Sequence, residues 1–234
     1  MTRQVVLDTE TTGLDPKLGD RIIEIGCVEI LSRRISDNHF HSYVNPERDI
    51  EEGAARVHGI TREALFAKPT FVQVAKGFLD YIHGAELIIH NADFDVAFLD
   101  MELGRAELGK LSDHVARITD TLVFARELHP GKRNSLDALC ERYFVSNSHR
   151  TLHGALLDAR LLAECYLAMT RGQESLVMEL ESPASAAAAL LQVDISSLVV
   201  LRAAPEELAL HEKYLDAMEK EAKGGTLWRK LVVG

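Results

Sequence analysis

The feature that most constrains this sequence is a short apolar run that ends in two acids and a turn. The run is Val5-Val6-Leu7, and it leads into Asp8-Thr9-Glu10 and the turn-prone Thr11-Thr12-Gly13. Apolar, mostly β-branched residues before a Thr/Gly segment predict a buried strand that ends at a loop. Because side chains alternate along a strand, we expect Asp8 and Glu10 to project from the same face.

Two neighbouring carboxylates repel each other, and burying them beside a core is costly unless a cation lies between them. A pair of hard divalent ions, which prefer oxygen ligands, would satisfy both acids. An isolated D-x-E is more often a solvated strand end. The metal-binding interpretation therefore depends on further residues that converge on Asp8 and Glu10.

The rest of the chain predicts an α/β domain followed by a tail of different composition. After the first strand, further strands are expected at 21–31, 34–44, 86–90 and 115–119. Short helical turns are expected within 47–66, and longer helices at 71–83, 91–107, 121–128, 135–143 and 152–170. The Ala-rich stretch 183–189 is typical of a linker, and a strand at 197–201 and a helix from Pro205 to about Lys223 follow it. We divide the chain into a folded domain, 1–171, a linker segment, 172–196, and a tail, 197–234.

Composition limits the class of protein. The formal net charge of −10 has the wrong sign for a free-standing nucleic-acid binder, but it fits an enzyme whose acids hold metals. The three cysteines, Cys27, Cys140 and Cys165, lack C-x-x-C spacing, which indicates a reduced compartment. A strand that begins at residue 5 leaves no room for a signal peptide, and no apolar run approaches the ~20 residues of a membrane span. We expect a cytoplasmic protein with no membrane association.

Acids also follow or open later elements. Asp95 comes just after the strand 86–90, and Asp158 lies five residues beyond His153 near the start of the last predicted helix of the domain. Carboxylates gathered around two metal ions about 3.5–4 Å apart are the usual apparatus of phosphodiester hydrolysis. A histidine that titrates near neutrality can take a proton from the attacking water.

Three strings carry a family resemblance: VLDTETTG, HNADFD and LHGALLDA. They resemble the three exonuclease motifs of the DEDD superfamily, histidine subclass. The runs HPGKRNSLDALC and RTLHGALLDA bring the chain closer still to the proofreading (epsilon) subunits of bacterial DNA polymerase III. The similarity extends from Val5 through Thr170 and resumes in the tail.

The resemblance implies a ribonuclease H-like fold, a mixed five-stranded sheet with the first strand central and helices on its flanks, plus a flexible C-terminal partner-binding extension. It implies 3′→5′ excision of deoxynucleoside monophosphates from a mispaired DNA end, with two Mg²⁺ or Mn²⁺ ions as cofactors. Asp8, Glu10 and Asp158 would hold the catalytic ion, and Asp8 would bridge to a second ion that contacts Asp95 through water. His153 would be the general base.

The resemblance also implies a site for the terminal nucleotide. Its residues would be Asp8, Thr9, Glu10, Thr11, His58 and Asp158. For His58 the alternative is a packing or helix-capping role. Where the family often has a glutamate that touches the nucleotide, this chain has Gly53, and Glu51 or Glu52 could substitute. Lys132 and Arg133 either contact DNA phosphates or only solvate their loop.

Partners are implied for the segments after the domain. Gln173, Leu176 and Met178 resemble the peptide with which the family binds the β sliding clamp. The tail, with the chain's only tryptophan, Trp228, resembles the part that docks on the polymerase alpha subunit. The DNA substrate would be a single-stranded or frayed 3′ end, and the expected location is the cytoplasmic replisome. The resemblance also allows a small accessory subunit like the one found in some bacteria.

The acidic motifs are also compatible with two alternatives to DNA proofreading. An RNA-trimming exonuclease of the same superfamily would share the acidic motifs, but the clamp-like and polymerase-docking segments count against it. A non-catalytic tether between polymerase and clamp would not need all five residues of the catalytic type, and the sequence contains all five. Nucleotide release from RNA or from mispaired DNA would separate the two enzymes.

Overall fold

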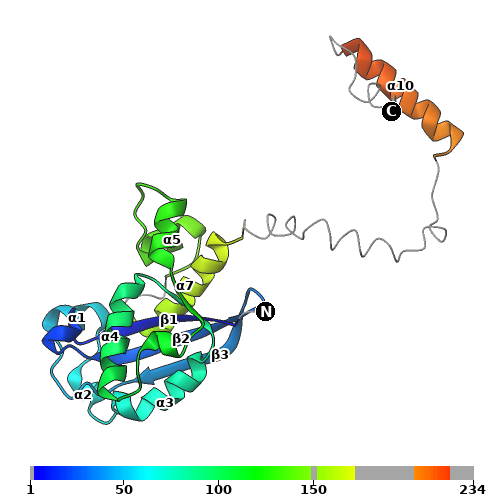
Figure 1. The fold of residues 1–234 in the computed structure, drawn as a ribbon. Coiled ribbons are helices and arrows are strands. Elements are labelled where there is room, and N and C mark those ends of the chain that lie inside the picture. The colour runs from blue at the N-terminus through cyan, green and yellow to red at the C-terminus, as the bar shows by residue number, and fades with distance from the viewer. Residues whose placement is uncertain (1–2, 149–151, 172–202, 222–234) are drawn as a thin grey trace, which may run out of the picture. The chain divides into compact units, whose positions relative to one another are not determined.

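The first strand lies at the centre of a five-stranded mixed sheet with the order β3-β2-β1-β4-β5 (Figure 1). The strands are β1 (Gln4–Thr11), β2 (Ile22–Leu31), β3 (Arg34–Tyr43), β4 (Glu86–Ile89) and β5 (Arg117–Asp120). The pairs β1–β2 and β2–β3 are antiparallel, whereas β4 runs parallel to β1 and to β5. The expected fold class, with the first strand central, is confirmed.

The computed structural model describes residues 3–148, 152–171 and 203–221. The chain divides into two compact units, residues 1–177 and 178–234, and the sheet belongs to the first. The helices of the first unit are α1 (Glu52–His58), α2 (Arg62–Leu65), α3 (Phe71–Ile82), α4 (Ala92–Arg105), α5 (Thr121–Leu128), α6 (Leu136–Tyr143) and α7 (Ala155–Met169). Two short 3₁₀ helices, η1 (Pro16–Leu18) and η2 (Leu111–Asp113), interrupt its loops.

In the second unit the structure describes one helix, α10 (Pro205–Glu221), which begins with Pro205 as the sequence predicts. Leu215 is its buried residue, whereas Leu208 is exposed. The predicted strand at 197–201 and the linker lie outside the described residues. None of the described helices combines the length and the apolar character that crossing a membrane requires.

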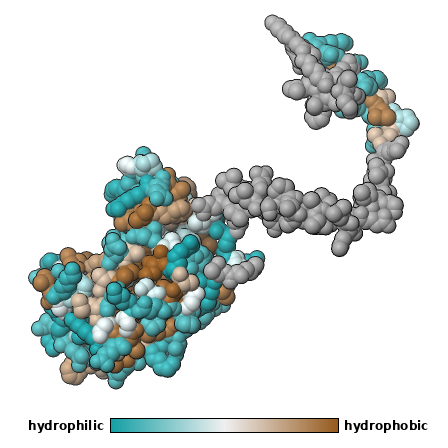
Figure 2. Space-filling view, viewed as in Figure 1, coloured by the Kyte–Doolittle hydropathy of each residue, from teal (hydrophilic) through white to brown (hydrophobic). Residues whose placement is uncertain are grey.

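Strand β1 is apolar on both faces because helices cover both sides of the sheet. Val5 and Leu7 belong to the core cluster that contains Phe71, Phe78 and Phe98 of α3 and α4. Val6 belongs to a second cluster with residues of α7. Figure 2 shows that polar residues cover most of the visible face of this unit, with apolar residues in smaller groups between them. The alternation along β1 therefore assigns odd positions to the α3–α4 layer and even positions to the α7 layer.

Two helix starts show how local sequence sets the elements. Helix α3 begins as predicted, with a capping box in which Gln73 Oε1 accepts a hydrogen bond from the backbone N of Thr70 at 2.8 Å. Helix α7 was expected from residue 152, but it begins at Ala155. The reason is that Gly154 is extended and the backbone N of His153 donates to Val57 O (3.1 Å), which holds His153 in the preceding loop.

The first turn of α7 lies directly on strand β2, and Gly26 permits this contact. Gly26 pairs with Asp8 of β1. A Cβ atom at residue 26 would lie 2.2 Å from the backbone of Ala155 and Leu156. Because both neighbours are backbone atoms, no rotamer change relieves the clash. Gly26 therefore fixes how closely α7 approaches the strand end that carries the first two acids.

We expect Gly26→Ala to reduce the free energy of unfolding by more than the ~1–3 kcal/mol typical of overpacked cores, because α7 must move away from the sheet. The matched control is Gly104→Ala on α4, where an added Cβ meets nothing within 4 Å and the replacement should stabilise by about 0.5–1 kcal/mol. Urea unfolding of the two variants measures both effects. Equal stabilities would contradict the role assigned to Gly26.

Candidate active site

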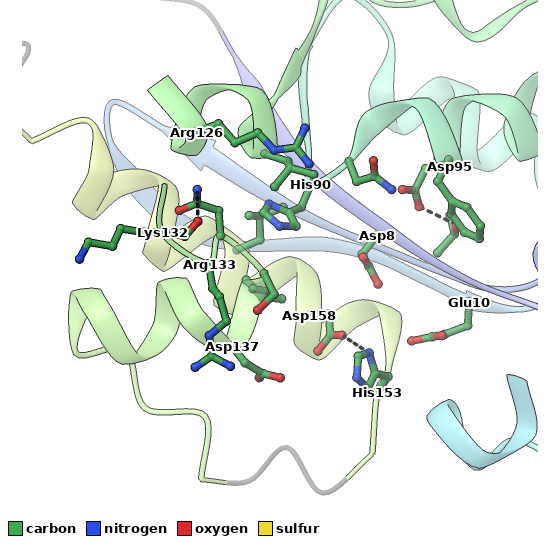
Figure 3. A pocket seen from close by; sticks show the side chains of 18 residues that line it. Asp8, Glu10, His90, Asp95, Arg126, Lys132, Arg133, Asp137, His153 and Asp158 are labelled. Carbon is green, nitrogen blue, oxygen red and sulfur yellow. Dashed lines mark hydrogen bonds and ion pairs between the residues drawn. The ribbon is translucent and has the colours of Figure 1, made fainter. Parts of the chain in front are cut away.

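The first acids lie at the carboxyl end of β1, on the face that α7 covers. Asp8 and Glu10 share the even positions of the strand with Val6, which packs in the α7 layer. Glu10 is buried, with 8% of its surface exposed, and Asp8 is half-buried. The shared face that the sequence predicts is therefore present. Both side chains line a single pocket (Figure 3).

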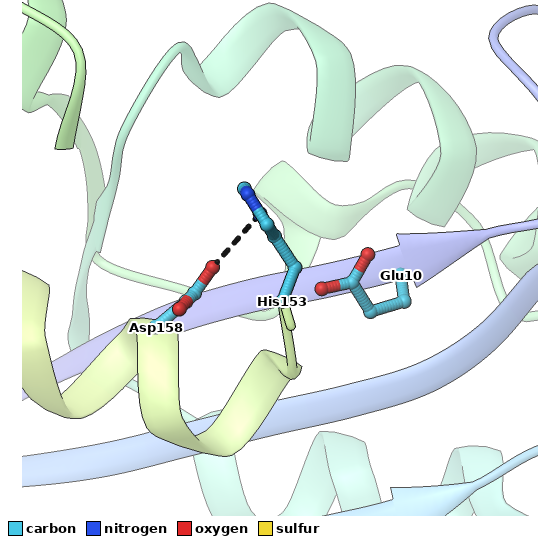
Figure 4. A group of neighbouring side chains, drawn as sticks. All are labelled: Glu10, His153 and Asp158. Carbon is cyan, nitrogen blue, oxygen red and sulfur yellow. Dashed lines mark ion pairs between the residues drawn. The ribbon is translucent and has the colours of Figure 1, made fainter. Parts of the chain in front are cut away.

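Helix α7 brings Asp158 and His153 to the same place. Asp158 is in the first turn of the helix, is 3% exposed, and lies 3.2 Å from His153, measured from Oδ2 to Nδ1. Figure 4 shows Glu10 facing this pair, and one potential ligand atom from each of the three residues lies within 4.8 Å of the others. Residues more than 140 positions apart thus form one polar cluster at the tip of β1.

A buried acid that the sequence analysis missed positions this helix. Glu24 of β2 is 3% exposed, and its Oε2 accepts a hydrogen bond from the backbone N of Ala155 at 3.2 Å. Its Oε1 contacts His41 Nε2 at 2.7 Å. The first backbone N–H groups of a helix have no partner within the helix, so Glu24 satisfies one of them. Only the register of β2 against β1, which places Glu24 opposite Glu10, could have indicated this role.

Asp95 approaches from the opposite side of the sheet. It lies in the first turn of α4, whose start is held by the carboxylate of Asp120, an acceptor for the backbone N of Ala92 at 3.0 Å. Thr9 occupies an odd position of β1 and donates its hydroxyl to Asp95 Oδ1 at 2.7 Å. Asp95 lines the same pocket as the other acids, but it is not part of the close cluster of Glu10, His153 and Asp158.

Burial controls the charge of Asp95. Loss of solvent raises the pKa of its carboxyl group to about 7, against the opposing effect of the hydrogen bond from Thr9. The nearby carboxylate of Asp120 raises the pKa further. Near neutral pH, a cation in the pocket would favour the ionised form of Asp95 by offsetting the cost of its burial.

The pocket has a volume of about 880 Å³ and carries charges of both signs. Asp8, Glu10, Asp95, His153 and Asp158 all line it. Arg126, Lys132 and Arg133, with Asp137 beside Arg133, line the side of the pocket away from Glu10 and Asp95 in Figure 3. Sequence analysis did not identify Arg126, because an exposed arginine on an amphipathic helix gives no signal of its own.

The donor set fits divalent cations. Glu10, Asp95 and Asp158 are all buried acids, and Asp8 is half-buried beside them. Buried carboxylates in such proximity are unfavourable unless they are protonated or share a cation. Carboxylate oxygens are the ligands that Mg²⁺ and Mn²⁺ prefer. The residues therefore could hold hard divalent ions with His153 beside them.

The residues predicted to contact a nucleotide do not all line the pocket. Thr9 lines the pocket, whereas Thr11 and His58 do not. The hydroxyl of Thr11 donates to Gly13 O at 2.7 Å, and His58 Nδ1 accepts from the backbone N of Ile60 at 3.0 Å. His58 is 5% exposed, and burial lowers its pKa against the opposing effect of a hydrogen bond to the backbone of Thr11.

Other predicted positions are not part of the described site. Gly53 lies in α1, where an added Cβ atom would meet nothing within 4 Å, and Glu51 and Glu52 beside it are exposed. Gln173, Leu176 and Met178 of the predicted clamp peptide lie outside the described residues, as does Trp228.

Comparison with known proteins identifies relatives across the whole chain. Residues 5–166 match the family model RNase_T, described as exonuclease. The DNA polymerase III subunit epsilon of Pasteurella multocida is 50% identical over 240 residues, which cover 98% of this chain and 94% of that protein. The subunit of the same name from Escherichia coli K12 is 50% identical over 240 residues and covers 98% of both chains.

Solved structures with the same fold include two exonucleases. Exonuclease X, in complex with 5′ overhanging duplex DNA, is 26% identical with a TM-score of 0.57, over 72% of this chain and 92% of that one. Escherichia coli exonuclease I in complex with a dT13 oligonucleotide is 19% identical with a TM-score of 0.66, over 76% of this chain and 43% of that one. At this identity the second likeness concerns the fold alone.

The raised pKa of Asp95 predicts a pH-dependent effect on the stability of the metal-free protein. The folded state holds this proton more tightly than the unfolded state, whose carboxyl has a pKa of about 4, so stability falls as pH rises from about 4 to 7. Asp95→Asn removes the charge and can keep the Thr9 hydrogen bond. We expect it to be more stable than wild type by roughly 1–4 kcal/mol at pH 8 in chelator, with the difference narrowing towards pH 4.

Denaturant unfolding at several pH values measures this difference. The control is Asp93→Asn, which changes an exposed acid of the same helix turn and should show no comparable dependence on pH. A stability difference between Asp95→Asn and wild type that stays constant from pH 4 to pH 8 would show that burial does not raise the pKa of Asp95.

Proposed function

The chain belongs to the exonuclease family, and within it to the epsilon subunits of DNA polymerase III; from this premise we propose that it is the 3′→5′ proofreading exonuclease of a replicative polymerase. It removes mispaired 3′-terminal nucleotides as deoxynucleoside monophosphates. The observation that carries the proposal is the convergence of Glu10, His153 and Asp158 within 4.8 Å, in a pocket that Asp8 and Asp95 also line. A catalytically inactive tether would have no need for buried acids in this arrangement.

The acids are assigned to metal binding. Asp8, Glu10 and Asp158 would hold one divalent ion, and Asp8 and Asp95 would serve a second, with Mg²⁺ or Mn²⁺ as the cations. Such ions activate water for attack on a phosphodiester and stabilise the leaving oxygen. The proximity of Glu10 to Asp158 and the burial of Asp95 support this assignment.

His153 is assigned as the general base. Its Nδ1 lies 3.2 Å from Asp158 Oδ2, and 44% of its side chain is exposed. If Nδ1 carries the proton shared with Asp158, Nε2 is the ring atom that accepts a proton from the attacking water. The hydrogen bond from the backbone N of His153 to Val57 O holds the loop that aims the ring.

Contacts with the terminal nucleotide are assigned to Thr9, Thr11 and His58, together with the acids. The hydrogen bond from Thr9 to Asp95 and the position of Thr9 on the pocket wall support its part. For His58 the support is its electrostatic interaction with His153, which lines the pocket. The substrate that we assign is a single-stranded or frayed 3′ end, as the family resemblance implies.

The chain acts within the polymerase III complex, as the names of its relatives imply for them. We assign residues 1–171 to the nuclease domain, 172–196 to the clamp-binding peptide and linker, and 197–234 to the tail that binds the alpha subunit. Gln173, Leu176 and Met178 are the anchors for the β sliding clamp. The location is the cytoplasmic replisome, and co-purification tests whether a small accessory subunit accompanies the complex.

Removal of divalent cations is expected to abolish digestion of a mispaired primer, and added Mg²⁺ or Mn²⁺ should restore it. Asp8→Ala should remain inactive at every cation concentration while it still binds the polymerase. Gel analysis of a labelled primer measures the first effect and co-purification the second. Digestion by Asp8→Ala at the wild-type rate would point to a contaminating nuclease and contradict the assignment.

His153→Ala is expected to lower kcat by ~10²–10⁴-fold at saturating cation, which is the usual range for loss of a general base. His39→Ala, which changes an exposed histidine of β3, is the control and should retain wild-type kcat. Single-turnover kinetics with parallel calorimetric titration of Mn²⁺ separates the roles. A loss below tenfold argues against general-base catalysis, and a parallel loss of Mn²⁺ affinity would make His153 a ligand instead.

A further inference from the structure

The basic side of the pocket is not used by the proposed chemistry. We name Arg126 of α5 and Lys132 and Arg133 of the loop before α6 the cationic rim (Figure 3). All three residues are exposed and line the pocket. Asp137, an acid that accepts a hydrogen bond from Asn147 Nδ2 at 3.1 Å, lies beside them, so positive charge predominates on this side.

Several arginines of the unit form ion pairs with acids. Arg21 pairs with buried Glu102, Arg48 pairs with Asp20, and Arg117 pairs with Glu86. Among the ion pairs between described residues, none joins Arg126, Lys132 or Arg133 to a carboxylate. In a chain with a net charge of −10, three such cations around one pocket are not explained by internal pairing.

The loop that carries two of these cations is fixed by hydrogen bonds. Asn134 is 7% exposed, and its side-chain amide donates to Lys132 O at 3.2 Å. Arg142 of α6 donates to Asn134 Oδ1 at 3.0 Å and to Arg133 O at 2.6 Å. Gly131 adopts the left-handed conformation that the turn requires, with φ of +73°. The backbone therefore presents Lys132 and Arg133 at the pocket rather than in a freely moving loop.

We propose that the cationic rim binds the DNA phosphates on the 5′ side of the scissile phosphodiester, and this rests on the proposed function. When the scissile phosphate lies at the acids, the DNA strand must continue out of the pocket. Its next phosphates need cations, and the cationic rim supplies them on the side of the pocket away from Glu10 and Asp95. Contacts of this kind position a strand without reading its sequence, as removal of any mispaired nucleotide requires.

The number of phosphates in the substrate tests the proposal. A dinucleotide with free hydroxyl ends contains only the scissile phosphate, whereas a tetranucleotide with the same 3′ end adds two phosphates on the 5′ side. For the full chain at saturating Mg²⁺ we expect kcat/KM to be at least tenfold higher on the tetranucleotide. Lys132→Gln/Arg133→Gln should raise KM about tenfold on the tetranucleotide and less than twofold on the dinucleotide, with kcat retained.

Salt dependence and two further variants complete the experiment. The slope of log KM against log salt on the tetranucleotide should fall by about 1–1.5 in Lys132→Gln/Arg133→Gln, since each single-strand phosphate contact contributes about 0.7. Arg34→Gln/Lys68→Gln removes the same charge from exposed residues that do not line the pocket and should behave as wild type. Lys132→Arg/Arg133→Lys keeps the charges and should retain the wild-type KM.

Three outcomes overturn the proposal. The first is an unchanged KM on the tetranucleotide. The second is an equal loss on both substrates, which would indicate a structural role for the loop. The third is an equal loss in Arg34→Gln/Lys68→Gln, which would indicate a general effect of net charge. Failure of the wild-type protein to hydrolyse either substrate would instead overturn the proposed function itself.

Discussion

The structure depends on the cost of holding several carboxylates together out of water. Oxygens of Glu10 and Asp158 lie within 4.8 Å of each other, and both side chains are buried. Two like charges at this separation repel by about 3 kcal/mol at an effective dielectric constant of about 20. Such a cluster lowers the free energy of unfolding, so the stability of the fold does not explain it. The proposed cation binding accounts for the cluster, because acids that destabilise the metal-free protein would become ligands of a bound divalent ion.

Strand β1 organises the site through its alternation. Its even positions place Asp8 and Glu10 towards α7, which brings Asp158 and His153, and its odd positions place Thr9 towards α4, which brings Asp95. One central strand can therefore connect acids from two helices that cover opposite faces of the sheet. The contact with Gly26 sets how closely α7 approaches the sheet on one face. The hydrogen bond from Thr9 to Asp95 holds the start of α4 near β1 on the other face.

Much of this site could be predicted from the sequence because its signals are local. The period of a strand places Asp8 and Glu10 on one face, and an acid after the strand 86–90 identifies Asp95. The family resemblance predicted that the first strand lies at the centre of the sheet. It also predicted that His153 and Asp158 belong to one site. The start of α7 was predicted wrongly, since the apolar pattern does not reveal that Gly154 is extended and that the backbone of His153 bonds to Val57 O.

The parts that sequence reasoning missed depend on contacts between distant segments. Glu24 can cap α7 only because β2 packs against the start of that helix. Arg126 lies on the basic side of the pocket only because α5 packs beside the site. The most direct test of the account is anomalous diffraction from crystals soaked in Mn²⁺ and a deoxynucleoside monophosphate. The account predicts a manganese peak bounded by the carboxylates of Asp8, Glu10 and Asp158. Manganese bound only at surface acids, with these three carboxylates uncoordinated, would contradict it.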